Sequence, residues 1–569
     1  MHKLNDVERN LMSCRHRPIS YYIYFFEEEI LMKMKKALSI ALALVFAIGM
    51  LAGCSAGTLE ETSADISAFV DNDEKLDITW LGYAMLAGCT EGQATELLFE
   101  EEFNLNITPV FAEYAKYTDK KNALLQSGDI PDLIYELDPM HVFADARDEF
   151  LLSVPYEAIE KYAPSVYAEL NKKAPAAWAY TYYDGANYGL PNMENAHMEV
   201  KVSSYRKDWL DNLDLEIPKT IDELHDVLYA FQYDDPDGNG KDDTYGYAPS
   251  QPAYAAYFSE IYGAYGVLPF DWEEVDGEIV YGGLRDECED ALALLHEWYK
   301  EGIIYPGFVE VDQYADQLFR DSKIGYTTGI GYSDPTSTYT LALMEKVPTA
   351  EFAYGPIVKG PEGDAGIRVW GDACHAVAFG ANGEQSPVKV TRLLKLFERM
   401  FTDEAFMVEA RVGKEGEVYT IDRTTTKKTV FVATKDYEES SQKRLAGYQF
   451  TMSGPTFWSP IAPKAEVYQN YQTDYYLNFV KENYDPSVLK SDVFYKVDIV
   501  PSAPTYIEDL RNQQMKLMTQ CIKGEIPCDQ YVEEFTKIWE GTGGPQMLDE
   551  AKEQQEILEE IYAKIGIDK

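Results

Sequence analysis

Basic residues, histidines and cysteines are all scarce in this sequence of 569 residues. It holds 50 lysines and arginines against 97 aspartates and glutamates, a formal net charge of −47. Nucleic acids and anionic membrane surfaces are bound through clustered Lys and Arg, so this balance argues against both classes of partner. Seven histidines leave little room for histidine-based metal catalysis. Seven cysteines without paired short spacings exclude a disulfide scaffold and a Cys-ligated zinc module.

The apolar content is high enough for a large folded core. Hydrophobic residues make up 46% of the chain and aromatic residues 13%, including 43 tyrosines. A chain with this composition is not disordered in spite of its charge.

An export signal is predicted near the N-terminus. The basic stretch Met34-Lys35-Lys36 precedes an apolar run from Ala37 to Met50, which is shorter than the ~20 residues of a membrane-spanning helix. The following Leu51-Ala52-Gly53-Cys54 resembles the bacterial lipobox, which implies cleavage before Cys54 and a diacylglycerol anchor on its sulfur. We therefore expect residues 1–53 to be a signal peptide, with 1–31 an upstream extension and synthesis from Met32 or Met34, and residues 54–75 to be a lipidated flexible tether.

Strand-like and helical patterns alternate after the tether. Leu76–Trp80, Ile107–Val110 and Ile130–Leu137 have strand patterns, and Glu91–Phe103 and Tyr114–Gln126 between them have helical ones. Such alternation predicts a parallel α/β sheet.

Further helices are predicted in the rest of the chain. Thr220-Ile221-Asp222-Glu223 has the pattern of a capping box, and a helix is expected from Thr505 onward. Trp209, Trp298 and Trp539 fall on apolar helical faces, which predicts that they belong to the core.

Five short segments carry a family resemblance. They are Ser127–Ile134 (SGDIPDLI), Asp184–Pro191 (DGANYGLP), Tyr205–Leu210 (YRKDWL), Glu301–Pro306 (EGIIYP) and Arg411–Gly416 (RVGKEG). In order and spacing they resemble the extracellular solute-binding proteins of ABC importers (family 1), most of all the long lipoprotein branch that binds oligosaccharides, including alginate oligosaccharides. Tyr305 replaces an acidic residue of the family pattern.

The resemblance implies an α/β fold of the two-lobe, periplasmic-binding-protein-like type II class, with parallel and mixed sheets flanked by helices and a hinge between the lobes. It also implies a monomer that captures an oligosaccharide between the lobes, delivers it to the transmembrane subunits of an ABC permease, and catalyses no reaction. The expected divisions are lobe 1 at 76–190, lobe 2 at 191–370, a return to lobe 1 at 371–430, and a C-terminal helical part at 431–569 that completes lobe 2 and the hinge.

Residues 235–246 have the spacing of a calcium-binding loop. As in an EF-hand, side-chain oxygens occur at the first, third, fifth and ninth positions, and Gly240 stands at the sixth. The last position is Gly246, so the usual bidentate glutamate is missing. We expect a structural Ca²⁺ with an affinity of about 10⁻⁴ to 10⁻³ M; the alternative is an acidic turn without metal. The expected ligands are Asp235, Asp237, Asn239, the Lys241 carbonyl and Asp243, completed by water or Thr244.

Candidate ligand-binding residues follow from how proteins hold sugars. Aromatic rings stack on apolar sugar faces, and carboxylates and amides bind hydroxyls. Ligands of parallel α/β folds lie outside the carboxyl ends of the strands, so residues after strands and crossovers are the candidates. They are Trp80, Tyr83, Asp138, Asn192, Glu194, Tyr332, Trp370, Asp372 and Trp458.

Three alternatives remain open, on the function, the ligand and one cysteine pair. A secreted, calcium-stabilised carbohydrate-active enzyme is the second function, although HExxH, Walker and Rossmann patterns are absent, and the many carboxylates allow a catalytic pair to be drawn anywhere. The net charge favours a neutral or amino-sugar oligosaccharide over a polyanionic one, with a peptide as the alternative ligand. Cys521 and Cys528 flank Gly524 and could form a disulfide, but buried free thiols are favoured.

Overall fold

The computed structural model describes most of the chain between residues 65 and 567. The described residues are 65–84, 92–113, 116–193, 202–249, 257–309, 315–328, 338–369, 371, 373–422, 430–433, 479, 482, 484, 486–495 and 499–567. They belong to one structural unit, Thr62–Lys569. The predicted signal peptide and Cys54 lie outside them.

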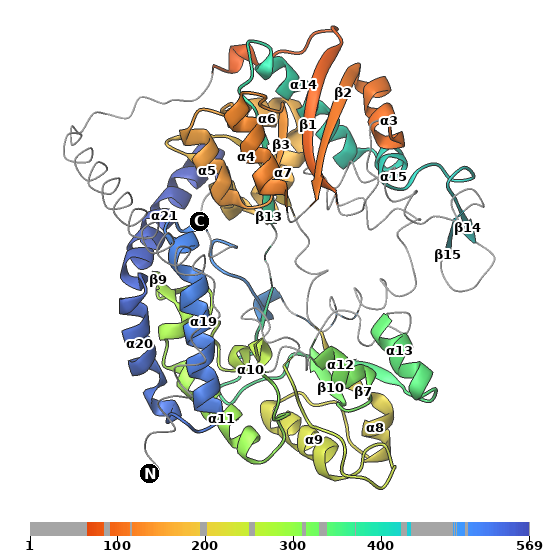
Figure 1. Cartoon of the computed structure of the whole chain (residues 1–569), viewed down its shortest axis with the longest axis vertical. Coiled ribbons are helices and arrows are strands. Elements are labelled where there is room, and N and C mark those ends of the chain that lie inside the picture. The colour runs from red at the N-terminus through yellow and green to blue at the C-terminus, as the bar shows by residue number, and fades with distance from the viewer. Residues whose placement is uncertain are drawn as a thin grey trace, which may run out of the picture. The chain divides into compact units, whose positions relative to one another are not determined.

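A five-stranded sheet combines the first part of the chain with one strand that returns to it (Figure 1). Its order is β2 (Leu105–Glu113), β1 (Leu76–Ala84), β3 (Leu133–Glu136), β13 (Ala373–Phe379) and β6 (Gly189–Met193). β1 pairs in parallel with β2 and β3, whereas β13 is antiparallel to both β3 and β6. Strands β1, β2, β3 and β6 therefore end at one edge of the sheet, and β13 begins there. We call this the carboxyl edge.

The predicted alternation of strands and helices is confirmed. Helices α3 (Ala94–Phe103), α4 (Tyr117–Ser127) and α5 (Pro139–Arg147) follow β1, β2 and β3 in turn. Helix α4 ends at Gly128, whose φ of 82° is the left-handed conformation that a glycine adopts without strain, and the Gly128 N–H bonds the last carbonyls of the helix.

More helices cover the sheet. They are α6 (Tyr156–Tyr162), α7 (Pro164–Lys173), the 3₁₀ helix η4 (Pro175–Tyr180), α14 (Ser386–Thr402) and α15 (Glu404–Val412), with the short hairpin of β4 (Tyr182–Tyr183) and β5 (Ala186–Asn187) after η4. Val390, Leu393, Leu394 and Phe397 recur at helical spacing and form the buried face of α14. Every residue of β3 is buried, as expected for a strand with both faces covered.

The middle of the chain forms an antiparallel sheet of three strands. Its order is β10 (Tyr326–Thr328), β7 (Ser203–Arg206) and β11 (Phe352–Gly355). The other elements of this part of the chain are α8 (Lys207–Asn212), α9 (Ile221–Tyr233), α10 (Ser259–Ala264), β8 (Trp272–Val275), β9 (Glu278–Tyr281), η7 (Gly282–Leu284), α11 (Glu287–Lys300), α12 (Ala315–Arg320) and α13 (Thr338–Lys346). Thr220 caps α9 as predicted, since its hydroxyl accepts from the Glu223 N–H at 3.2 Å. The Glu223 carboxylate, however, accepts from the N–H of Lys219 and not from that of Thr220.

The end of the chain is helical, as predicted for the residues from Thr505 onward. Helix α19 (Ala503–Ile522) begins two residues before Thr505, because Pro504 occupies its first turn. It packs against α11 and against α20 (Tyr531–Gly541), and α21 (Gly544–Ile565) follows. The remaining elements are η2 (Ile66–Ala68), β12 (Ile367–Arg368), β14 (Tyr419–Asp422), β15 (Val430–Ala433), η11 (Pro486–Val488), β16 (Leu489–Lys490) and η13 (Cys528–Gln530).

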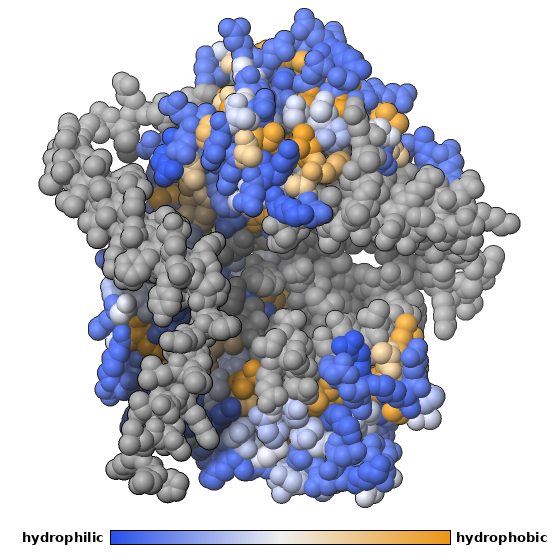
Figure 2. Space-filling view, in the orientation of Figure 1, coloured by the Kyte–Doolittle hydropathy of each residue, from blue (hydrophilic) through white to orange (hydrophobic). Residues whose placement is uncertain are grey.

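The surface and the core agree with the composition. Trp209, Trp298 and Trp539 are buried, which confirms their predicted core positions. The face shown in Figure 2 is mostly hydrophilic where it is coloured, with small separate apolar areas. Within the described ranges, no helix combines the length and the apolar character needed to cross a bilayer.

Candidate functional site

The carboxyl edge brings together polar side chains from distant parts of the chain. Asn192, near the end of β6, pairs with His375 on β13, just after a shift in strand register at the start of β13. Asn192 Nδ2 donates to the hydroxyl of Tyr135 on β3 at 3.1 Å. The rings of Tyr135 and His375 lie 5.4 Å apart between centroids. Three strands therefore contribute to one group of side chains, Tyr135, Asn192 and His375, which we call the edge cluster.

Hydrogen bonding in the edge cluster is incomplete. Asn192 is fully buried, and its Oδ1 has no hydrogen-bond partner among the described residues. A buried amide oxygen without a partner costs free energy, so a donor such as a water or a ligand hydroxyl would stabilise it. His375 is partly buried, and its Nδ1 lies 2.8 Å from the Leu137 carbonyl oxygen. We assign the ring proton of the neutral form to Nδ1, which makes Nε2 the acceptor nitrogen.

Asp138 lies at the same edge, directly after Leu137. Its carboxylate accepts a hydrogen bond from the Met140 N–H at 3.0 Å and caps α5, whose first residue is Pro139. The side chain is only partly buried. Asp138 therefore has a structural role that does not remove its carboxylate from the carboxyl edge.

The predicted calcium loop forms a tight turn after α9. Asp235 accepts from the N–H of Asn239 at 3.0 Å and from the N–H of Gly240 at 2.9 Å. Asn239 Nδ2 donates to Asp237 at 2.8 Å and to Asp243 at 3.1 Å. The three carboxylates selected by their spacing thus all contact Asn239. Gly240 has a φ of 74°, the left-handed conformation for which glycine is suited.

The donor chemistry of this loop suits a hard cation, but its side chains are engaged with one another. Lys323 Nζ lies 2.7 Å from Asp243, and the hydrogen bonds from Lys323 and Asn239 hold the pKa of the Asp243 carboxyl below its usual value. In the described part of the chain, no three acidic, histidine or cysteine side chains are arranged as a metal-binding group. A bound Ca²⁺ would therefore have to displace the Asn239 amide hydrogens from the carboxylates. The structure argues against Thr244 as a ligand of the ion. Its side chain is buried and its hydroxyl donates to the Phe231 carbonyl oxygen, so water is the better candidate to complete the coordination shell.

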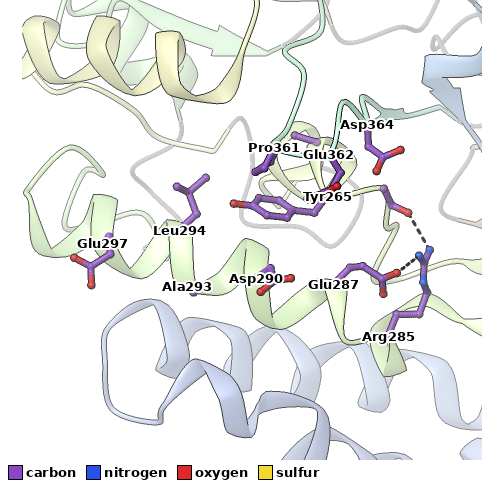
Figure 3. A pocket seen from close by; sticks show the side chains of 12 residues that line it. Tyr265, Arg285, Glu287, Asp290, Ala293, Leu294, Glu297, Pro361, Glu362 and Asp364 are labelled. Atoms are coloured by element: carbon purple, nitrogen blue, oxygen red, sulfur yellow. Dashed lines mark hydrogen bonds and ion pairs between the residues drawn. The ribbon is translucent and has the colours of Figure 1, made fainter.

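A separate cavity of about 700 Å³ lies between α11, the segment after α10 and the segment before β12 (Figure 3). Five carboxylates and the partly buried ring of Tyr265 contribute to its lining. Among the described residues of the lining, Arg285 is the one basic residue, and it donates to Glu287 at 2.6 Å and to the Gly266 carbonyl at 2.9 Å. This electrostatic environment disfavours an anionic sugar. The five carboxylates belong to Glu287, Asp290, Glu297, Glu362 and Asp364.

Residues 98–386, from α3 to the start of α14, match the family described as bacterial extracellular solute-binding protein. The chain belongs to this family. The resemblance found in the five sequence segments is thereby confirmed.

Several solute-binding proteins are similar to this chain over most of its length. The polygalacturonan/rhamnogalacturonan-binding protein YtcQ of Bacillus subtilis is 28% identical over 412 residues, which cover 70% of this chain and 78% of YtcQ. The Streptococcus pneumoniae ABC-transporter substrate-binding protein FusA, solved in complex with kestose, has a TM-score of 0.61 at 18% identity and covers 86% of this chain and 99% of its own. An extracellular solute-binding protein from Bifidobacterium longum subsp. infantis has a TM-score of 0.63 at 16% identity, covering 87% of this chain and 100% of its own. These likenesses confirm the predicted two-lobe, periplasmic-binding-protein-like fold.

The structure corrects one predicted ligand-binding residue of this solute-binding protein. Trp80 is 1% exposed, stacks on Phe99 at 6.2 Å between ring centroids, and meets Phe397 edge-on. Its ring belongs to the core because it lies in mid-strand under helices α3 and α14, and it presents no face to a sugar.

The other predicted residues divide into two groups. Asp138 and Asn192 lie at the carboxyl edge, and His375, which was not among the predicted residues, lies there with them. The side chain of Tyr83 and the whole of Glu194, Tyr332, Trp370, Asp372 and Trp458 lie outside the described residues. A histidine five residues after Trp370, at the return to the sheet, was the available signal for His375.

Proposed function

We propose that this solute-binding protein captures an oligosaccharide outside the cytoplasm and delivers it to the membrane permease of an ABC importer, without chemical turnover. The observation that carries the proposal is its likeness, over most of the chain, to FusA bound to kestose and to YtcQ, named for polygalacturonan and rhamnogalacturonan. Both relatives are binding proteins for sugar polymers or oligomers by name.

The ligand site that we propose is the carboxyl edge. Its support is the buried Asn192 Oδ1, which no described residue hydrogen-bonds, together with the neighbouring acceptor nitrogen of His375 and the carboxylate of Asp138. Chain connectivity adds further candidates. Glu194 directly follows the last residue of β6, and Asp372 directly precedes the first residue of β13. We retain Tyr83, Tyr332, Trp370 and Trp458 as candidate stacking residues.

Isothermal titration calorimetry with kestose and with a galacturonate trimer tests both site and ligand class. We expect binding of a neutral oligosaccharide such as kestose, because a chain of net charge −47 disfavours a polyanion. Replacing His375→Ala is expected to weaken binding at least tenfold. The matched control is His225→Ala, on α9, whose ring contacts Glu301. Equal losses in both variants would remove the carboxyl edge as the site, while binding of the galacturonate trimer alone would refute a neutral ligand and leave the importer function intact.

The enzymatic alternative is separated by a product assay. Incubation of the protein with each sugar, followed by chromatography, is expected to return the sugar unshortened. Release of smaller sugars at a rate proportional to protein concentration would establish the alternative, a carbohydrate-active enzyme.

We propose in addition that residues 235–246 hold a structural Ca²⁺ through Asp235, Asp237, Asn239, the Lys241 carbonyl and Asp243. Support comes from the oxygen donors at these positions and from a FusA structure described as an EF-hand mutant, which has a TM-score of 0.60 to this chain. Thermal unfolding with millimolar CaCl₂ or EDTA is the test. We expect Ca²⁺ to raise the midpoint of the wild type and of the control Asp242→Ala, whose side chain stands outside the donor set, but not that of Asp237→Ala. An equal response of both variants would refute the site.

Anchoring through Cys54 is our third proposal. It rests on the lipobox-like LAGC sequence and on the Bacillus subtilis relative named lipoprotein LipO, which is 23% identical over 451 residues. Expression of wild type and Cys54→Ala in a Gram-positive host should place the first in the membrane fraction and the second in the medium. Recovery of wild-type protein in the medium would contradict the anchor.

A further inference from the structure

Two cysteines meet at the end of helix α19. The chain leaves the helix through Gly524, whose φ is 73° and whose N–H bonds the Cys521 carbonyl at 2.9 Å. It then turns back, so that η13 begins at Cys528. The Cys528 sulfur lies 3.7 Å from the Cys521 carbonyl oxygen. Both residues are free thiols in this structure.

The turn that joins them is held in place by α11. His296 Nδ1 lies 3.0 Å from the Ile522 carbonyl, and a Cβ on Gly524 would come within 2.7 Å of the His296 ring. On the other side of Cys528, the Val532 N–H donates to Glu289 at 3.0 Å. The approach of the two cysteines is therefore fixed by packing before any bond joins them.

The two thiols differ in accessibility and in acidity. Cys521 is fully buried, whereas Cys528 is partly exposed. The hydrogen bond between the two thiols lowers the pKa of Cys528 and raises that of Cys521. Since a reagent in solution reaches only the partly exposed sulfur, Cys528 is the nucleophile and Cys521 the buried partner. Asp529, Glu289 and Glu297 lie near enough to add negative charge at Cys528.

We propose that Cys521 and Cys528 are a modification site, oxidised to a disulfide by exchange with a small disulfide outside the cytoplasm. The Cys528 thiolate attacks one sulfur of the reagent and expels the other half as a thiolate. Cys521 then attacks the mixed disulfide, loses its proton to the departing half, and closes the Cys521–Cys528 bond. One reagent disulfide is reduced to two thiols for each protein disulfide formed. Because the surroundings are anionic, a cationic disulfide reacts faster than an anionic one.

Cys288 is an internal control on the neighbouring helix α11. It is fully buried, its sulfur donates to the Gly282 carbonyl at 3.4 Å, and burial raises the pKa of its thiol well above the usual value. It should remain a thiol under conditions that oxidise the pair.

Peptide mapping of the purified full chain tests the proposal. The folded protein is treated with cystamine or with oxidised glutathione, unfolded, alkylated and digested with trypsin. Cleavage after Lys516, Lys523 and Lys537 places the two cysteines on separate peptides, 517–523 and 524–537. We expect the two peptides to be linked by a disulfide, with a mass about 2 Da below the sum of the two reduced peptides, and to separate on reduction. The linked product should form faster with cystamine than with oxidised glutathione, and Cys288 should be found alkylated. Two fully alkylated peptides after saturating cystamine would overturn the proposal.

Single variants test the order of attack. With cystamine, Cys521→Ser should accumulate a mixed disulfide on Cys528, because the second step is removed. Cys528→Ser should leave Cys521 unmodified. A mixed disulfide on Cys521 in the Cys528→Ser protein would refute the assigned roles.

Discussion

Replacing Lys121 with Met tests the buried charges beneath the carboxyl edge. Lys121 is 1% exposed, and its Nζ lies 2.8 Å from Glu136 and 2.5 Å from Asp145. Glu136 is fully buried, and His141 Nδ1 is 3.8 Å from its carboxylate. The substitution leaves two acidic side chains facing each other with no lysine between them. Removing one partner of a buried ion pair costs about 3–5 kcal/mol of unfolding free energy.

The size of this loss should depend on pH. Burial, which outweighs the attraction of Lys121, raises the pKa of Glu136 from 4.5 to about 7. Near pH 5 Glu136 is protonated and needs Lys121 less, so Lys121→Met should lose less stability at pH 5 than at pH 8. Urea unfolding followed by tryptophan fluorescence and circular dichroism at both pH values is the assay. The control is Lys116→Met, which breaks an exposed pair with Glu113 and should leave the unfolding midpoint unchanged. A loss below about 1 kcal/mol at pH 8, or an equal loss at the two pH values, would refute this reasoning.

Three other substitutions have outcomes set by the same structure. Between pH 4.5 and about 7, folded Glu136 keeps a proton that the unfolded chain releases, so its contribution of about 3 kcal/mol to the free energy of unfolding is full below pH 4.5 and is lost as the pH rises through 7. Glu136→Gln should therefore flatten the dependence of the unfolding free energy on pH over this range. A wild-type dependence that is already flat there would contradict the raised pKa. Gly189→Ala places a Cβ 2.2 Å from the Val377 carbonyl oxygen, so the antiparallel pairing of β6 and β13 must shift. We expect the free energy of unfolding, measured in urea, to fall by about 1–3 kcal/mol. Thr220→Ala removes the side-chain cap of α9 and should cost about 1 kcal/mol, which Thr220→Ser should restore.

Local sequence patterns predicted much of the fold, because strands, helices and helix caps depend on interactions between residues that are close in the sequence. The alternation of strand and helix between residues 76 and 137 reflects side-chain periodicity, and the cap at Thr220 needs only residues within one turn. The core positions of Trp209, Trp298 and Trp539 likewise followed from helical spacing. Helix ends were predicted less well, as at α19, where Pro504 allows the helix to begin before Thr505.

Tertiary contacts decided what local patterns could not. Trp80 is the last residue of the predicted first strand, yet β1 continues to Ala84 and helices cover the ring, so a place at the end of a strand pattern did not make it a ligand-binding residue. Arg206, in the family-like segment Tyr205–Leu210, forms a local ion pair with Asp208 at 2.6 Å, and its guanidinium lies over Trp209, a contact that no spacing in the segment predicts.

The amino-acid sequence by itself determined the family, the type of fold and the oxygen donors of the loop at residues 235–246, because each depends on residue types at short, ordered spacings. Only the tertiary structure placed His375 opposite Asn192, and Lys121 between Glu136 and Asp145. The first pairing joins strands that are far apart in the chain, and the second depends on how α4 and α5 pack near β3. Strand register and helix packing are set by the whole core, which no local spacing encodes.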